Sequence, residues 1–258
     1  MPVHEPTLNI PALNKTIFAH RGLPTRAPEN TLAAFQATVQ GGGKWIETDV
    51  DIIADGTPII IHDSTLDRTT DHKGSFYPLQ QADLTSIDAG RWFGEAFAGE
   101  RIPTLRQLID FINEHQLNLN LEIKQNEQGA RQTIRLINAI IKELGRLSPQ
   151  CQVIVSSFSQ PILMAFHERA PAYAIGVLFE TATLQSDWLT VLELCGATYA
   201  HVENDGLTHQ TVEQLSTAGY GVNVWTVNNI ERAKELFAWG CTGVFTDISD
   251  KMTAVLES

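Results

Sequence analysis

The stretch WIETDVD, residues 45–51, places three acidic side chains on alternate positions of a segment that otherwise resembles a buried strand. Because successive side chains of a strand point to opposite faces, Glu47, Asp49 and Asp51 share one face. Two carboxylates about 5 Å apart repel each other by roughly 3 kcal/mol at an effective dielectric of about 20. A bound cation, basic neighbours, shifted protonation or full exposure to water must therefore offset the repulsion.

The elements that position these residues follow from a regular alternation of short apolar runs with segments of helical apolar spacing. Eight strands alternating with helices favour an α/β fold with parallel pairing, most commonly a closed (β/α)₈ TIM barrel, with a doubly wound open sheet as the alternative. The predicted strands are residues 17–20, 45–50, 119–124, 152–157, 173–179, 197–202, 221–226 and 242–247. The predicted helices lie around residues 30–40, 104–116, 127–144, 160–169, 186–194, 208–219 and 229–239.

Two segments depart from this alternation. Residues 51–61 have the pattern of a hairpin with Asp55-Gly56 at its turn, and we interpret them as an extension of the second strand. Residues 64–101 are too long for an ordinary connection, so they are predicted to form a small inserted subdomain of a single domain spanning residues 1–258. Its aromatic residues, Trp92 and Phe93 among them, are expected to cover the mouth of the barrel.

Acidic residues from two neighbouring strands are predicted to meet at that mouth, where the carboxyl ends of the barrel strands converge. Glu47 and Asp49 come from the second strand, and Glu122 comes from the next barrel strand. Oxygen ligands of this kind suit one hard divalent cation, Mg²⁺ or Ca²⁺. Asp51 shares the face but lies beyond the predicted end of its strand, so Asp51→Asn is expected to be mild.

Basic residues and histidines end strands at the same mouth. His20 and His62 each follow an apolar run, and histidine exchanges protons near neutral pH, so the pair is predicted to perform acid–base chemistry. Arg21 and Lys124 are placed to hold a phosphate together with the metal, or simply to neutralise nearby carboxylates.

The motifs that carry these residues resemble those of the glycerophosphodiester phosphodiesterases, in particular the bacterial cytoplasmic type. They are HRG at 20–22, PENT at 28–31, ETD at 47–49, HD at 62–63, LEIK at 121–124 and VNVWTVN at 222–228, with RTT (68–70) and IPTL (102–105) bracketing the insertion. The resemblance implies a (β/α)₈ barrel with a small insertion after the second strand. It also implies metal-dependent hydrolysis of glycerophosphodiesters to sn-glycerol 3-phosphate and an alcohol.

The resemblance further implies roles for individual residues. By motif, the acid–base pair is His20 and His62, the metal ligands are Glu47, Asp49 and Glu122, the phosphate is bound by Arg21 and Lys124, Glu29 supports the metal site or Arg21, and the glycerol pocket is lined by Phe158 and Trp225. No Ser or Cys stands in an obvious triad, which favours attack by the substrate's own 2-hydroxyl through a cyclic phosphate. A related phospholipase-D-like lyase, or a Schiff-base aldolase using Lys124, is the alternative.

Composition limits the partners. The 258 residues include 18 Lys and Arg against 30 Asp and Glu, a formal net charge of -12. Such a chain is not expected to bind nucleic acid or to associate stably with membranes, so a glycerophosphodiester is its predicted small-molecule partner. The sequence is compatible with either a monomer or a homo-oligomer.

The cysteines and the N-terminal stretch predict a cytoplasmic location. Cys151, Cys195 and Cys241 are odd in number and far apart, which favours a reducing compartment. The stretch MPVHEPTLNIPALN lacks the basic start and apolar core of a signal sequence, and no segment has the apolar length of a membrane span.

Overall fold

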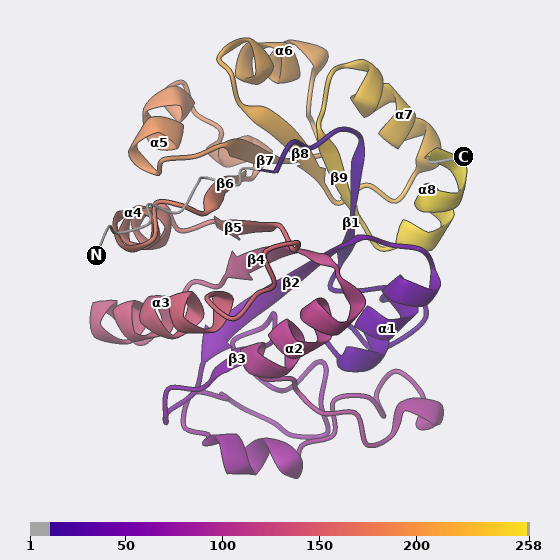
Figure 1. Ribbon diagram of the computed structural model, residues 1–258, viewed down its shortest axis with the longest axis vertical. Helices are drawn as coiled ribbons and strands as arrows, with labels where there is room; N and C mark the ends of the chain where they lie inside the picture. Colours follow the sequence, from indigo (N-terminus) through magenta and orange to yellow (C-terminus); the bar gives the residue numbers. More distant parts are fainter. Residues whose placement is uncertain (1–10, 257–258) are drawn as a thin grey trace.

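The computed structural model describes residues 11–256 and shows parallel strands closed into a barrel, with helices around it (Figure 1). The barrel closes because β1 pairs in parallel with both β2 and β9. The predicted (β/α)₈ fold is therefore confirmed. Among the described residues the eight parallel strands are β1 (Thr16–His20), β2 (Trp45–Ile52), β4 (Asn118–Ile123), β5 (Val153–Ser157), β6 (Ala174–Phe179), β7 (Tyr199–Glu203), β8 (Gly221–Trp225) and β9 (Gly243–Thr246).

Helices follow the barrel strands and pack on their outer face (Figure 1). The last helix is not among the predicted ones. Its buried residues are Ser249 and Met252, which are too few to give the apolar spacing of a helix in the sequence. The helices are α1 (Leu32–Gln40), α2 (Leu105–His115), α3 (Ala130–Leu144), α4 (Gln160–Arg169), α5 (Trp188–Leu194), α6 (His209–Thr217), α7 (Ile230–Ala238) and α8 (Ser249–Leu256).

The barrel interior is filled by an aromatic cluster below the strand ends. Phe18 stacks on Phe245 with ring centroids 4.5 Å apart and meets Trp45 edge-on at 5.1 Å. His201 is fully buried beside Phe245, and burial lowers its pKa to about 3, so it is a neutral packing residue. Because this floor is closed, the strand ends above it are the surface on which a site can form.

The second strand continues into a hairpin, as predicted. β3 (Pro58–Ile60) runs antiparallel to β2, with Val50 opposite Ile60, and the turn uses Gly56 at a φ of 96°. β2 is longer than predicted, however, and ends at Ile52. The expectation that Asp51 lies beyond the strand end is therefore wrong: Asp51 is inside the strand and 2% exposed.

Residues 64–101 project from one side of the barrel (Figure 1), with two short 3₁₀ helices, η1 (Gln81–Thr85) and η2 (Glu95–Phe97). Buried side chains such as Phe76 and Tyr77 form a second hydrophobic cluster with residues of the β2–β3 hairpin. Trp92 and Phe93 instead pack edge-on against each other, and Trp92 is 41% exposed. The aromatic side chain of the insertion that reaches the barrel mouth is Tyr77.

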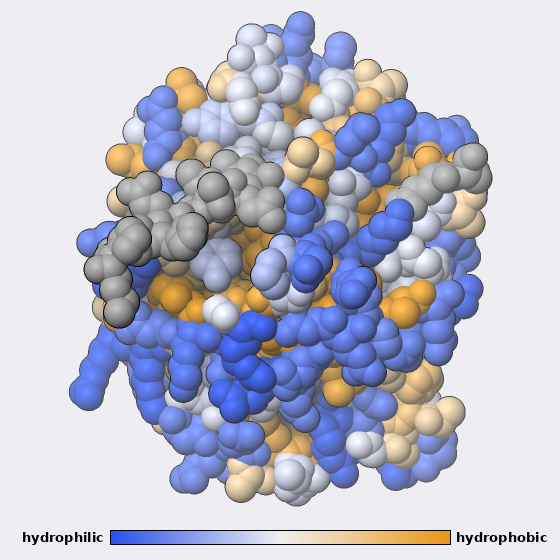
Figure 2. Space-filling model, in the orientation of Figure 1, coloured by the Kyte–Doolittle hydropathy of each residue, from blue (hydrophilic) through white to orange (hydrophobic). Residues whose placement is uncertain are grey.

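Three observations concern the polarity of the surface and the state of the cysteines. Across residues 11–256, no helix combines the length and the apolar character needed to cross a membrane. The face shown in Figure 2 is largely hydrophilic. Cys151, Cys195 and Cys241 are buried free thiols. Residues 1–10, on which the expectation of a missing signal sequence partly rests, lie outside the described residues.

The second hydrophobic cluster predicts which aromatic residues hold the insertion together. Phe76→Ala should destabilise it by about 3–5 kcal/mol, the usual cost of deleting a fully buried Phe ring. The measurement is hydrogen-exchange protection across residues 64–101, with Trp92→Ala as the exposed aromatic control. Equal protection in the two variants would contradict this assignment of the core.

Candidate active site

Three buried carboxylates meet at the ends of β2 and β4. Glu47 and Asp49 face the same side because they alternate along β2, and Asp49 lies opposite Glu122 in the parallel register. All three are at most 9% exposed, and one oxygen from each lies within 4.8 Å of the others. The predicted ligand set is thus assembled in space, and it matches the oxygen-rich sites that hold divalent cations.

Two basic side chains partly neutralise the cluster. Lys124 Nζ lies 2.7 Å from Glu122 Oε1 and 3.3 Å from Asp49 Oδ1, and Arg21 Nε lies 3.5 Å from Asp49 Oδ2. Burial would raise the pKa of Asp49, but Lys124 and Arg21 outweigh it and lower that pKa. Burial and the charge of Asp49 raise the pKa values of Glu47 and Glu122. When no cation is bound, shifted protonation and basic neighbours therefore both reduce the repulsion among the three carboxylates.

The β1–α1 connection wraps tightly around this cluster. Arg21 and Asn30 both have left-handed φ values, 56° and 58°, and the Asn30 N–H donates to the Arg21 carbonyl. Gly22 has a φ of 87°, and a Cβ there would lie 2.7 Å from Ala34. The bends direct the Arg21 N–H to Glu47 Oε2 at 3.1 Å and the Asn30 side-chain amide to Asp49 Oδ2 at 2.8 Å. Strained backbone of this kind is typical of functional sites.

Each predicted histidine is held by a carboxylate. His20 Nδ1 lies 2.8 Å from Asp247 Oδ1, and His62 Nδ1 lies 2.7 Å from Asp63 Oδ1. Burial would lower the pKa of His20, but Asp247 and Glu47 outweigh it and raise that pKa. Burial lowers the pKa of His62 despite the charge of Asp49. Neither Nε2 forms a hydrogen bond with another residue in the described range 11–256, so this nitrogen of each ring can contact a ligand.

An ion-pair network connects His62, just before the insertion, to the β1–α1 connection. Arg68 donates two hydrogen bonds to Asp63, at 2.7 and 2.9 Å, and two to Glu29, at 2.7 and 2.9 Å. Glu29 also accepts from the Arg21 guanidinium at 2.9 Å. Of the two places predicted for Glu29, the structure therefore puts it beside Arg21.

The predicted residues lie in the wall of one pocket of about 300 Å³ or close beside it. Phe158 and Trp225 meet edge-on in its wall, with ring centroids 5.4 Å apart. Asp49 lies behind the lining, and Lys124 lines the adjoining hollow. The predicted residues that line the pocket directly are His20, Arg21, Glu47, His62, Glu122, Phe158 and Trp225.

Several neighbours of these residues are not among the predicted site residues. Asp247 follows the last strand at a chain distance of 227 residues from His20, and Arg68 lies in the RTT motif. Asn120 is also missed, although it lies two residues before Glu122 and so shares its face. The alternation of side chains along the strand would have been enough to predict Asn120 as a site residue. The sequence contains no local pattern that pairs Asp247 with His20.

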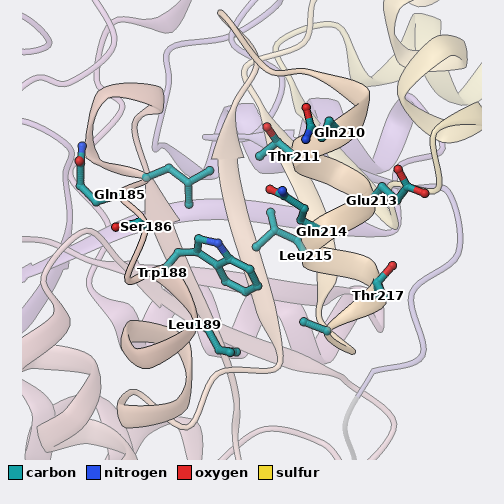
Figure 3. Close-up of a pocket in the computed structure, with 12 residues that line it drawn as sticks. Gln185, Ser186, Trp188, Leu189, Gln210, Thr211, Glu213, Gln214, Leu215 and Thr217 are labelled. Atoms are coloured by element: carbon teal, nitrogen blue, oxygen red, sulfur yellow. The ribbon is translucent and has the colours of Figure 1, made fainter.

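A larger hollow lies elsewhere, between α5 and α6 on the outside of the barrel (Figure 3). Its volume is about 910 Å³, and Trp188 faces Gln214 and Leu215 across it. Among its described lining residues, Glu213 is the one charged side chain and none is a histidine. Of these two hollows, the one at the barrel mouth contains histidines and the carboxylate cluster, which can exchange protons or bind a cation.

Comparison with known proteins agrees with this geometry. The model of the glycerophosphoryl diester phosphodiesterase family matches residues 20–251. A glycerophosphodiester phosphodiesterase of Caldanaerobacter subterraneus is 33% identical over 231 residues, covering 90% of this chain and 93% of the relative. One from Bacillus subtilis is 32% identical over 244 residues, covering 90% and 83%.

A solved structure has the same fold. It is an Oleispira antarctica phosphodiesterase in complex with the product sn-glycerol 3-phosphate, 33% identical, with a TM-score of 0.90 and coverage of 95% of this chain and 98% of that one. Fold and site together define a (β/α)₈-barrel enzyme that hydrolyses phosphoric diesters. The chain belongs to the glycerophosphoryl diester phosphodiesterase family.

The His20–Asp247 pair gives a prediction about protonation. Asp247→Asn removes an anion that favours the protonated ring, so the pKa of His20 should fall. The measurement is an NMR titration of the histidine ring protons. Asp71→Asn, at the exposed His72 pair, is the matched control and should leave His20 unchanged. An unaltered pKa of His20 in Asp247→Asn would show that the two side chains are not paired in solution.

Proposed function

We propose that the chain hydrolyses small-molecule glycerophosphodiesters to sn-glycerol 3-phosphate and an alcohol. The observation that carries the proposal is the meeting of two carboxylate-bound histidines, His20 and His62, with the three-carboxylate cluster at one pocket. The Oleispira antarctica relative, which binds sn-glycerol 3-phosphate as its product, supports the same reaction.

Glu47, Asp49 and Glu122 are the proposed ligands of one divalent cation. The set fits because all three groups are buried carboxylates with oxygens within 4.8 Å, and a cation would let all three ionise, which burial and the charge of Asp49 oppose at Glu47 and Glu122. An all-oxygen set suits either Mg²⁺ or Ca²⁺. When bound, such an ion supplies positive charge that stabilises the phosphate oxygens as negative charge develops on them.

Arg21 and Lys124 are the proposed phosphate ligands of the chain itself. Arg21 lines the pocket, and its guanidinium is fixed on one side by Glu29. Lys124 has three N–H donors and two carboxylate partners, Glu122 and Asp49, so one donor is left for a ligand. Fixed donors bind a phosphate without the cost of ordering them during the reaction.

The glycerol moiety is proposed to occupy the 300 Å³ pocket. Phe158 and Trp225 supply apolar walls for its carbon chain. At the floor, the side-chain amide of Asn120 donates to Ser156 Oγ at 2.9 Å, which leaves Asn120 Oδ1 buried without a partner. A buried acceptor beside a hydroxyl is complementary to an alcohol group that both donates and accepts hydrogen bonds. This supports a hydroxylated ligand.

The positions of the histidines favour separate proton-transfer roles. His20 lines the glycerol pocket, whereas His62 lines that pocket and an adjoining one. We therefore assign to neutral His20 the removal of the proton from the glycerol 2-hydroxyl, whose oxygen forms a bond to phosphorus. The raised pKa of His20 and the lowered pKa of His62 make this pairing of a neutral His20 with a protonated His62 the minor protonation state of the empty site. The bond from phosphorus to the leaving alcohol breaks, and His62 donates the proton that this alcohol needs.

The first step produces a cyclic phosphate, which water then opens. In this second step His62 takes a proton from water as the new oxygen–phosphorus bond forms. His20 returns its proton to the 2-oxygen as the ring bond breaks, which yields sn-glycerol 3-phosphate. Both histidines are thus restored, and no group of the chain becomes covalently bound.

The two alternatives differ in their support. Burial would lower the pKa of Lys124, but Asp49 and Glu122 outweigh it and raise that pKa. A Schiff-base aldolase needs a neutral lysine, so the ion pairs argue against it. A lyase would stop at the cyclic phosphate, which the experiment below distinguishes from glycerol 3-phosphate.

The proposed nucleophile is tested with a substrate that lacks it. A glycerophosphodiester without the 2-hydroxyl should show a kcat lower by at least about 10²-fold, since a tethered nucleophile contributes up to roughly 7–11 kcal/mol. The matched control lacks the terminal hydroxyl instead and should retain most of kcat. The measurement is the release of alcohol, cyclic phosphate and glycerol phosphate in one assay. Similar kcat values for the 2-deoxy compound and the parent would mean that water is the first nucleophile.

A further inference from the structure

The carboxylates that hold the two histidines lie close to the protein surface. The side chain of Asp63, which follows His62 in the chain, is 27% exposed, and that of Asp247, which binds His20, is 30% exposed. A partly exposed side chain is solvated by water and loses entropy when it is held in one geometry. Each carboxylate therefore needs a further contact if it is to keep its histidine ring in one orientation.

Arg68 supplies that contact for Asp63. Its Nε donates to Asp63 Oδ2 at 2.7 Å, and its Nη2 donates to Oδ1 at 2.9 Å. Because the guanidinium group is planar, two bonds of this kind fix the plane of the carboxylate. A second edge of the same guanidinium donates to both oxygens of Glu29, at 2.7 and 2.9 Å. Arg68 is thus held on two sides, and a rotation of Asp63 would break its bonds to a fixed group.

Asn228 supplies the corresponding contact for Asp247. Its Nδ2 donates to Asp247 Oδ2 at 2.6 Å, while Oδ1 of the same carboxylate contacts His20. The Asn228 side-chain oxygen accepts from the Asp247 N–H at 2.8 Å and from the Thr246 hydroxyl at 3.1 Å. One amide therefore fixes both the backbone and the carboxylate of Asp247, although it comes from the connection after β8 and Asp247 follows β9.

A fixed carboxylate at Nδ1 determines where the histidine ring carries its proton. The hydrogen bond made by one ring nitrogen selects the tautomer of a neutral imidazole. With Nδ1–H held by an aspartate, the lone pair is on Nε2, and this nitrogen can accept a proton from a substrate. A protonated ring held in the same way donates from Nε2. The opposite tautomer would place N–H on Nε2 and could not act as a base there.

Arg68 and Asn228 act on the site from outside it. Neither is among the described lining residues of the glycerol pocket, so each reaches the substrate only through its aspartate and histidine. Arg68 is 44% exposed, and Asn228 is also exposed. Removing either side chain leaves no large cavity, so both can be substituted without loss of the fold.

We propose that Arg68 and Asn228 are positioning residues, which fix Asp63 at His62 and Asp247 at His20 so that both rings, when neutral, carry their proton on Nδ1. The inference rests on the proposed function, because it explains how the two histidines are kept ready for proton transfer. Loss of either residue should therefore slow the chemical step more than it weakens substrate binding.

The kinetic test measures kcat and KM for a glycerophosphodiester. Arg68→Ala and Asn228→Ala should each lower kcat at least about tenfold and change KM less than about threefold, since a misplacement of about 1 Å can cost roughly 10²-fold. Arg68→Lys keeps the charge but loses the planar fork, so it should be as slow as Arg68→Ala. Millimolar guanidinium ion should restore part of kcat in Arg68→Ala alone.

Two variants with equivalent bonds far from the histidines are the matched controls. Arg91→Ala removes a guanidinium that binds a glutamate within the insertion, and Asn113→Ala removes an amide that binds a backbone carbonyl. Both should keep the wild-type kcat. A wild-type kcat in Arg68→Ala and Asn228→Ala would overturn the proposal. A wild-type kcat in Arg68→Lys would also overturn it for Arg68, because charge alone would then suffice.

A second measurement does not depend on turnover. The ¹⁵N chemical shifts of the His20 and His62 rings, recorded where both rings are neutral, show which nitrogen carries the proton. Wild type should show Nδ1–H in both rings, Arg68→Ala should alter His62 alone, and Asn228→Ala should alter His20 alone. Unaltered shifts in both variants would overturn the proposal. If the wild-type chain cleaves no glycerophosphodiester, the proposed function fails, and the ring shifts still decide the positioning roles.

Discussion

The mutual repulsion of three buried carboxylates is the constraint on which the rest of this site depends. Oxygens of Glu47, Asp49 and Glu122 lie within 4.8 Å, where two like charges repel by at least roughly 3 kcal/mol at an effective dielectric of about 20. Burial adds the cost of removing each charge from water. A chain that keeps such a cluster at the mouth of a barrel needs positive charge there, and Lys124 and Arg21 supply only part of it.

The need for positive charge also explains how the surroundings are organised. Arg21 is held in place by a left-handed backbone and by Glu29, and Glu29 is held by Arg68. Arg68 in turn fixes Asp63, which binds His62. One chain of charge-assisted hydrogen bonds therefore runs from the acidic cluster to a proton-exchanging group in the segment that leads into the insertion. Such bonds are among the stronger ones in proteins, and they orient His62 before any substrate arrives.

Local patterns predicted the fold and the side chains that meet at the mouth. Alternation along β2 and β4 gave the faces of Glu47, Asp49 and Glu122, and parallel pairing brought them together. The partner of His20 could not be predicted in this way, because Asp247 is 227 residues away and barrel closure alone makes them neighbours. The aromatic residues of the insertion were expected at the mouth as a group, but Tyr77 lines it while Trp92 is exposed elsewhere, since aromatic composition does not reveal which side of an irregular segment faces the barrel.

The most direct test of this account measures cation binding together with stability in the wild-type chain and in Glu122→Gln. Calorimetry should detect one Mg²⁺ or Ca²⁺ ion per wild-type chain, and a concentration about 100 times Kd should stabilise the fold by about 2.7 kcal/mol. Glu122→Gln should bind the ion at least about tenfold more weakly. Without metal, it should unfold at a temperature no lower than the wild type, because a repulsive charge is gone. A wild-type chain that binds no divalent cation, or a metal-free Glu122→Gln that is clearly less stable, would contradict the account.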